Sequence, residues 1–221
     1  MHRMLKALER EEMVARDPVT KRYRLGPLVF ELGIAAAADF NLVDVCRPSL
    51  QRLAQATGDT AFLFIRRGYD SVCIDRLQGH YPIQTPVVTV GSRQPLGVNA
   101  GGLAMLQALP DAEVAEVAAA VAARLGAYGE FDDVDLRKAV TESRKRGYAS
   151  IGEKAVPGVT AIGLPVRNAY GAPSAALTIA ATSNRMTLTR QQEILPALQK
   201  EVGIVEELLY RPGHTAGAGV Y

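Results

Sequence analysis

Histidine and cysteine are the residue types that most often mark a catalytic or metal site. His2, His80 and His214 lie far apart in the sequence, and no pair has the spacing of metal ligands. Cys46 and Cys73 form no C-x-x-C motif, and Cys73 lies in an apolar run that favours a small buried side chain. The sequence has no nucleophile elbow, phosphate loop or dinucleotide fingerprint. We therefore expect no catalytic residue, no metal ligand and no cofactor.

The segment "GSRQPLGVNAGGLAML", residues 91–106, is a candidate binding site. It passes through Pro95 into a predicted helix whose first turn runs from Asn99 to Gly102. Small residues at a helix N-terminus let a ligand approach free backbone N–H groups and the positive end of the helix dipole, which suits a carboxylate. Close packing of a helix on a sheet also requires Ala and Gly. Both explanations stay open at this point.

Small residues also mark the segment "EKAVPGVTAIGLPV", residues 153–166. A loop at Pro157-Gly158 precedes a predicted strand that contains Ala161 and Gly163. These two residues leave space beside the strand, which is either a pocket or room for a bulky neighbour. A basic stretch over 135–147 is interpreted as a solvated helix face, since it also carries acids.

The positive charge of the chain is concentrated at its start. The net charge is +2, and the first 25 residues hold seven basic and four acidic side chains. Such asymmetry indicates an end that faces nucleic acid. The pattern predicts a helix over 2–12 with Met4, Leu5 and Leu8 on one face, followed by a strand, a turn at Asp17-Pro18 and a second strand.

The composition is that of an ordinary globular protein with one or two domains. Of the 221 residues, 48% are hydrophobic and 22% are charged. No stretch approaches the roughly 20 apolar residues that cross a bilayer, and the start of the sequence shows no apolar h-region of a signal peptide. We therefore expect a cytoplasmic protein without a membrane partner.

Helices and strands are predicted in mixed runs without strict βαβ alternation, which favours an α+β fold with a largely antiparallel sheet. Residues 81–91 are expected to form an edge strand or a loop, because prolines interrupt them. The predicted helices cover 28–38, 42–58, 99–109, 110–126, 132–147 and 189–210, and the predicted strands cover 60–66, 71–77, 148–154, 159–167 and 173–182.

Four motifs in this order resemble the isocitrate-lyase-regulator (IclR) family of bacterial transcription factors: "HRMLKALEREEMV" with "YRLGPLVFELG", then "GSRQPLGVNAGGLAML", "SRKRGYAS" and "GAPSAALTIAAT". The resemblance implies a GAF/PAS-like antiparallel sheet flanked by helices, preceded by a linker helix and a partial winged helix-turn-helix. The implied domains are the end of a recognition helix and wing at 1–26, a linker helix at 27–40, an effector-binding domain at 41–210 and a flexible tail at 211–221.

The resemblance also implies which residues line the effector pocket. Leu103, Gly97 and Ile151 replace polar or charged residues that are usual in the family, so the pocket is expected to be more apolar. We expect a small hydrophobic or aromatic carboxylate held by the N–H groups of Ala100 to Gly102, with Thr178 as the polar anchor. The implied effector-binding residues are Ile83, Pro86, Val88, Ala100, Gly101, Gly102, Ile151, Val159, Ala161, Thr178 and Ala180.

By the same resemblance, the chain begins inside the recognition helix, so either the true start lies upstream or this is a shortened form. We expect DNA to be a partner of the longer protein and to bind this chain weakly at most, through phosphate contacts. The implied DNA-binding residues are His2, Arg3, Lys6, Arg16, Lys21 and Arg22.

The resemblance predicts a ligand-responsive regulator that acts as a homodimer or homotetramer, with the linker helix as the dimer seam. A stand-alone sensing or interaction domain that never binds DNA is the alternative. A GAF-like enzyme is a second alternative, for which the sequence offers no set of catalytic residues.

Overall fold

The computed structural model describes residues 2–37, 42–85, 88–129, 131–152, 156–168 and 170–210. These residues fall into two compact units, an N-terminal unit that ends before Leu42 and a C-terminal unit that begins at Leu42. The expected tail at 211–221 and the end of the linker helix lie outside the described residues.

The N-terminal unit contains the predicted helix and hairpin. The Asp17 carboxylate accepts the N–H groups of Val19 and Thr20 at 2.9 and 2.6 Å, which closes the predicted turn. A Cβ atom at Gly26 would lie 1.9 Å from the carbonyl oxygen of Glu12, so only glycine fits after the hairpin. The elements are α1 (His2–Arg10), β1 (Val14–Arg16), β2 (Tyr23–Leu25) and α2 (Pro27–Ala37).

The C-terminal unit is built on a six-stranded antiparallel sheet with the strand order β5-β4-β3-β8-β7-β6. This arrangement confirms the predicted α+β class. Its elements are α3 (Leu42–Thr57), β3 (Thr60–Arg67), β4 (Asp70–Leu77), β5 (Arg93–Pro95), α4 (Ala100–Gln107), α5 (Asp111–Leu125), the 3₁₀ turn η1 (Gly126–Tyr128), α6 (Asp133–Arg146), β6 (Ala149–Gly152), β7 (Val159–Arg167), β8 (Pro173–Thr182) and α7 (Leu188–Tyr210).

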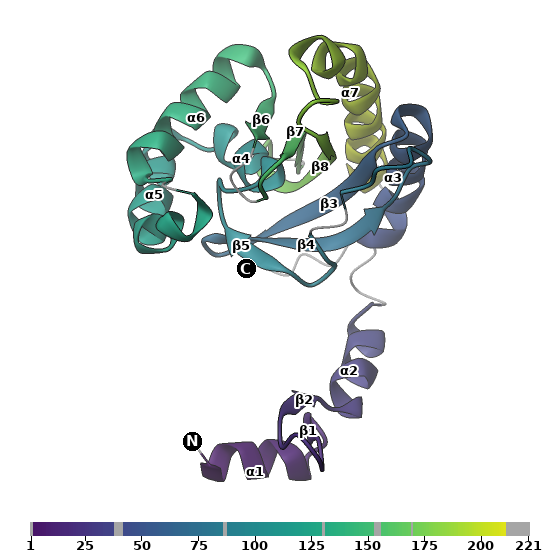
Figure 1. The fold of residues 1–221 in the computed structure, drawn as a ribbon, viewed down its shortest axis with the longest axis vertical. Coiled ribbons are helices and arrows are strands. Elements are labelled where there is room, and N and C mark those ends of the chain that lie inside the picture. The colour runs from purple at the N-terminus through teal and green to yellow at the C-terminus, as the bar shows by residue number, and fades with distance from the viewer. Residues whose placement is uncertain are drawn as a thin grey trace. The chain divides into compact units, whose positions relative to one another are not determined.

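The sheet separates two hydrophobic cores. Helices α4, α5 and α6 cover one face, and helices α3 and α7 lie side by side on the other (Figure 1). Side chains alternate between the two faces along β3. Phe62 and Phe64 pack in the core under α4, α5 and α6, and Ala61 and Leu63 pack in the core under α3 and α7. The two faces can therefore carry different functions.

The helix ends follow from local sequence. The side-chain oxygen of Asn99 accepts the N–H of Gly102 at 2.7 Å and caps α4. Asp132 caps α6 in the same way, and Gly147 ends α6 in the left-handed conformation.

The structure adds one strand to the prediction. Arg93–Pro95 pairs with β4 as the edge strand β5, whereas the sequence indicated only a turn leading into a helix. Three residues are too few to show alternation, and an edge position tolerates Pro95. The described residues of 81–91 contain no strand, so the loop alternative is the correct one there.

Helix α4 approaches the sheet closely at two glycines. A Cβ atom at Gly163 would lie 2.8 Å from Cγ2 of Thr178 and 2.9 Å from the carbonyl oxygen of Ala100. A Cβ atom at Gly101 would lie 2.4 Å from the ring of Phe64. The first turn of α4 therefore lies directly on β3, β7 and β8.

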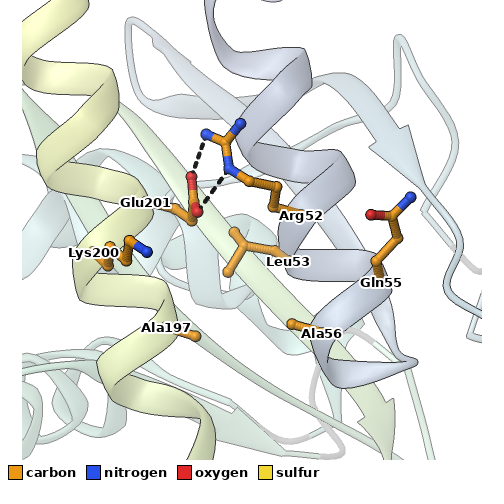
Figure 2. A pocket seen from close by; sticks show the side chains of 7 residues that line it. All are labelled: Arg52, Leu53, Gln55, Ala56, Ala197, Lys200 and Glu201. Atoms are coloured by element: carbon orange, nitrogen blue, oxygen red, sulfur yellow. Dashed lines mark hydrogen bonds and ion pairs between the residues drawn. The ribbon is translucent and has the colours of Figure 1, made fainter.

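A groove of about 470 Å³ lies on the other face, between α3 and α7. Figure 2 shows Arg52 and Glu201 facing each other across it. Nε and Nη2 of Arg52 donate to the two carboxylate oxygens of Glu201 at 2.9 and 2.6 Å, and Nη2 also donates to Ser49. The groove is lined by Arg52, Leu53, Gln55, Ala56, Ala197, Lys200 and Glu201.

The Arg52 contact sets the charge state of Glu201. Burial raises the pKa of this carboxyl, but the hydrogen bonds to Arg52 and Ser49 and the charge of Arg52 outweigh burial, so the pKa lies below its ordinary value. Because the folded state lowers this pKa, the stabilisation is complete above the ordinary pKa. It is lost as the pH falls through the folded-state pKa.

We expect Gly163→Ala to lower the free energy of unfolding by about 1–3 kcal/mol, because backbone and a packed methyl group would have to move. Urea denaturation of purified protein measures the change. Gly203→Ala on α7 is the matched control, since a Cβ atom at that position would have no neighbour within 4 Å. The control should raise stability by about 0.5–1 kcal/mol. Equal stability of Gly163→Ala and the wild type would contradict the close approach.

We expect Arg52→Met to cost about 1 kcal/mol at neutral pH, since the guanidinium is half exposed and partly screened by solvent. Urea denaturation between about pH 7 and about pH 3 should show the difference from wild type shrinking as Glu201 takes up a proton. Lys145→Met, which removes an exposed pair with Glu142, is the control and should change stability by less than about 0.5 kcal/mol. A difference that grows toward acid pH would refute the assignment.

Candidate effector site

Three of the predicted effector residues form a row across the sheet. Ile151 on β6 is paired with Ala161 on β7, and Ala161 is paired with Ala180 on β8. All three contact the core under α4, α5 and α6, and Ile151 and Ala161 stay partly exposed. Val159, also partly exposed, packs against the same core. The structure thus brings residues from three strands onto one face.

A second row contains the predicted polar anchor. Thr178 on β8 is paired with Gly163 on β7 and with Phe62 on β3. Thr178 is 1% exposed, and within the described residues its hydroxyl makes no side-chain hydrogen bond. This hydroxyl is therefore a candidate polar contact for a ligand on this face of the sheet.

The first turn of α4 lies above these rows. Ala100, Gly101 and Gly102 are buried, and the N–H of Gly102 already donates to Asn99. The N–H groups of Ala100 and Gly101 remain as helix-end donors without an intrahelical partner. Close packing on the sheet, one of the two explanations for these small residues, is therefore correct, and ligand binding at this turn stays a prediction.

The segment that was expected to close the pocket is only partly described. Val88 is buried in the same core as Ala180. Ile83 is 59% exposed and is not among the residues packed against that core. Pro86 lies outside the described residues.

Sequence reasoning did not select Phe62 and Arg76, which belong to the same face. The rings of Phe62 and Phe64 stack with centroids 6.0 Å apart. Arg76 is paired with Phe62 across β3 and β4, and its Nη1 donates to the carbonyl of Val88 at 3.1 Å. Period-two alternation in "TAFLFIRR" is the signal that places Phe62 and Phe64 together on one face.

The cysteines are structural. Cys73 is fully buried, as predicted, and Cys46 is fully buried in the other core. Burial raises the pKa of each thiol to about 12, so neither is a thiolate at neutral pH. Across the described ranges, no three His, Cys, Asp or Glu side chains gather as a potential metal site.

The predicted DNA-binding residues lie on α1 and on the hairpin of the N-terminal unit. Arg3, Lys6 and Arg22 are exposed. Arg16 lies over the ring of Tyr23 at 5.6 Å and donates to the carbonyl of Lys21, while Lys21 donates to Pro18. His2 is the first residue of α1, and its side chain is not described.

Comparisons with known proteins bear on the chain as a whole. It is 27% identical over 189 residues to the HTH-type transcriptional repressor AllR of Escherichia coli, covering 85% of this chain and 69% of AllR. The crystal structure of Thermotoga maritima IclR is 25% identical, with a TM-score of 0.76 over 95% of this chain and 85% of that chain. An IclR homologue from Microbacterium hydrocarbonoxydans, solved with 4-hydroxybenzoate, is 20% identical, with a TM-score of 0.73 over 93% of this chain and 82% of that one.

Along the described residues, no helix is both long enough and apolar enough to cross a membrane. The family description that matches the chain is the bacterial transcriptional regulator IclR C-terminal domain, over residues 34–205. This match covers most of the sequence and includes every strand of the six-stranded sheet. The chain belongs to the IclR family of bacterial transcriptional regulators.

Proposed function

We propose that this regulator responds to a small hydrophobic or aromatic carboxylate bound by the unit that begins at Leu42. One observation carries the proposal: Ile151, Ala161 and Ala180 form a continuous apolar row on a single sheet face. That row lies beside Thr178, a residue 1% exposed whose hydroxyl makes no side-chain hydrogen bond within the described residues.

The surroundings suit an acid with an apolar body. The ring of Phe62 and the small side chains of Ala161 and Ala180 offer apolar contacts. The Thr178 hydroxyl and the N–H groups of Ala100 and Gly101 would hold the carboxylate. The 4-hydroxybenzoate complex of the Microbacterium homologue supports this ligand class.

We also propose that the N-terminal unit contributes to DNA binding, in the cytoplasm, within a homodimer or homotetramer. Exposed Arg3, Lys6 and Arg22 would contact phosphates, and a dimer would match two half-sites. A bound acid changes DNA binding only if it favours one of two arrangements of the assembly.

A thermal-shift screen of purified protein tests the ligand class. Benzoate, 4-hydroxybenzoate and hexanoate should raise the melting temperature in a concentration-dependent way, because a ligand that binds only the folded state stabilises it. Benzamide and benzyl alcohol are matched neutral controls and should have smaller effects. Stabilisation by glyoxylate and pyruvate alone would reject the hydrophobic class. Stabilisation by an acid that never alters DNA binding would favour the stand-alone sensor.

A pair of matched substitutions locates the binding site. Ala161→Leu fills the partly exposed space beside the apolar row and should weaken binding of the best acid at least about tenfold. Ala197→Leu adds the same bulk to the α3–α7 groove and should leave the affinity unchanged. Isothermal titration calorimetry measures both. The opposite result, with loss only in Ala197→Leu, would move the site to the groove on the other face.

A further inference from the structure

Residues 79–85, called the strap here, cross directly over the turn between α3 and β3. A Cβ atom at Gly79 would lie 2.2 Å from the carbonyl carbon of Gly58, so the two backbones are in contact. The N–H of Tyr81 donates to the carbonyl of Gly58 at 3.0 Å. One end of the strap is therefore bound to the turn.

The other end of the strap is bound to the strands. The hydroxyl of Thr60 on β3 donates to Oε1 of Gln84 at 2.8 Å. The hydroxyl of Thr85 donates to the carbonyl of Ala180 on β8 at 3.2 Å. Since Ala180 belongs to the apolar row, the strap ends at the edge of the proposed effector site.

A partly buried cation holds the ring of Tyr81. The guanidinium carbon of Arg185, in the turn between β8 and α7, lies 3.9 Å from the centroid of that ring. Nε of Arg185 donates to Asp59 at 2.6 Å, and Nη2 donates to the carbonyl of Thr57 at 3.0 Å. The Asp59 side chain is 1% exposed. A guanidinium fixed in this way offers Tyr81 a rigid, partly desolvated surface, where cation–π attraction is strong.

We propose that Arg185 is a positioning residue that acts through Tyr81 to hold the strap against the edge of the effector site. The strap itself contacts Ala180, and Arg185 sets where the strap lies. The link to ligand affinity rests on the proposed function. The effect of Arg185 on the strap is independent of the proposed function, because the strap and its contacts exist in the protein without any bound acid.

Tyr81 is the position to change. Removing Arg185 would also take away the hydrogen-bonded partner of the buried Asp59 carboxylate, leaving only Arg190 at 3.7 Å, and would destabilise the fold around it. Tyr81→Leu keeps an apolar side chain but removes the π face. Tyr81→Phe keeps the ring and is the conservative control.

Hydrogen exchange without acid tests the strap. In Tyr81→Leu, the protection factor of the residue 81 amide should fall about 3- to 30-fold, the range that a cation–π contact supplies. Core amides of β3 and β8 and the melting temperature should stay close to wild type. Tyr81→Phe should retain protection within about twofold. Unchanged protection in Tyr81→Leu, equal loss in Tyr81→Phe, or a uniform loss across the unit would each overturn the proposal.

Calorimetry with 4-hydroxybenzoate tests the link to the site. Its affinity should fall about 3- to 30-fold in Tyr81→Leu and stay near wild type in Tyr81→Phe. A loosened strap with unchanged affinity would overturn the role in ligand binding. If wild-type protein does not bind 4-hydroxybenzoate, the proposed ligand class is what fails for this probe, and the exchange data still decide whether Arg185 positions the strap.

Discussion

The close approach of α4 to the sheet is the constraint on which the rest of the C-terminal unit depends. It is possible only because Gly101 and Gly163 carry no side chain where helix and strand meet. Because α4 lies so close to the sheet, Leu103 and Leu106 are completely buried in the core between them. The same approach brings the carbonyl oxygen of Ala100 against Gly163, which is paired with Thr178. Close packing alone therefore accounts for the small residues at this turn, and ligand binding there stays a prediction.

Local signals made most of the helices and strands predictable. The cap residues Asn99 and Asp132 and the left-handed Gly147 mark helix ends by chemistry that acts within a few residues. Local signals could not predict which side chains of β8 face which core. The run from Ala175 to Ala181 is buried on both faces of the sheet and shows no alternation of apolar and polar residues. The edge strand β5 was missed for a different reason, since its pairing depends on β4 and not on its own three residues.

The candidate site was predictable only in part. Ala161 and Gly163 stand out in the sequence because small residues inside a strand leave space, but the resemblance, not the composition, indicated which of them face a ligand. To predict that Phe62 pairs with Thr178, one must know that β3 lies next to β8 in the sheet. Contacts such as that between Asp59 and Arg185, 126 residues apart in the chain, join two residue types that are usually exposed. No local pattern indicates that such a pair is buried.

The Asp59–Arg185 pair is better explained by geometry than by stability. Burying two charges costs solvation that an ion pair recovers only when its remaining polar atoms are also satisfied. Here Oδ2 of Asp59 has no hydrogen-bond partner within the described residues, and Arg190 is 3.7 Å away as a second cation. Replacing a buried ion pair by apolar residues of similar volume is often neutral or stabilising. What the ion pair adds is a fixed plane: with Nε on Asp59 and Nη2 on Thr57, the guanidinium cannot rotate away from Tyr81. The ion pair therefore fixes the orientation of the guanidinium over Tyr81, and that fixed orientation is what the solvation cost of the pair supports.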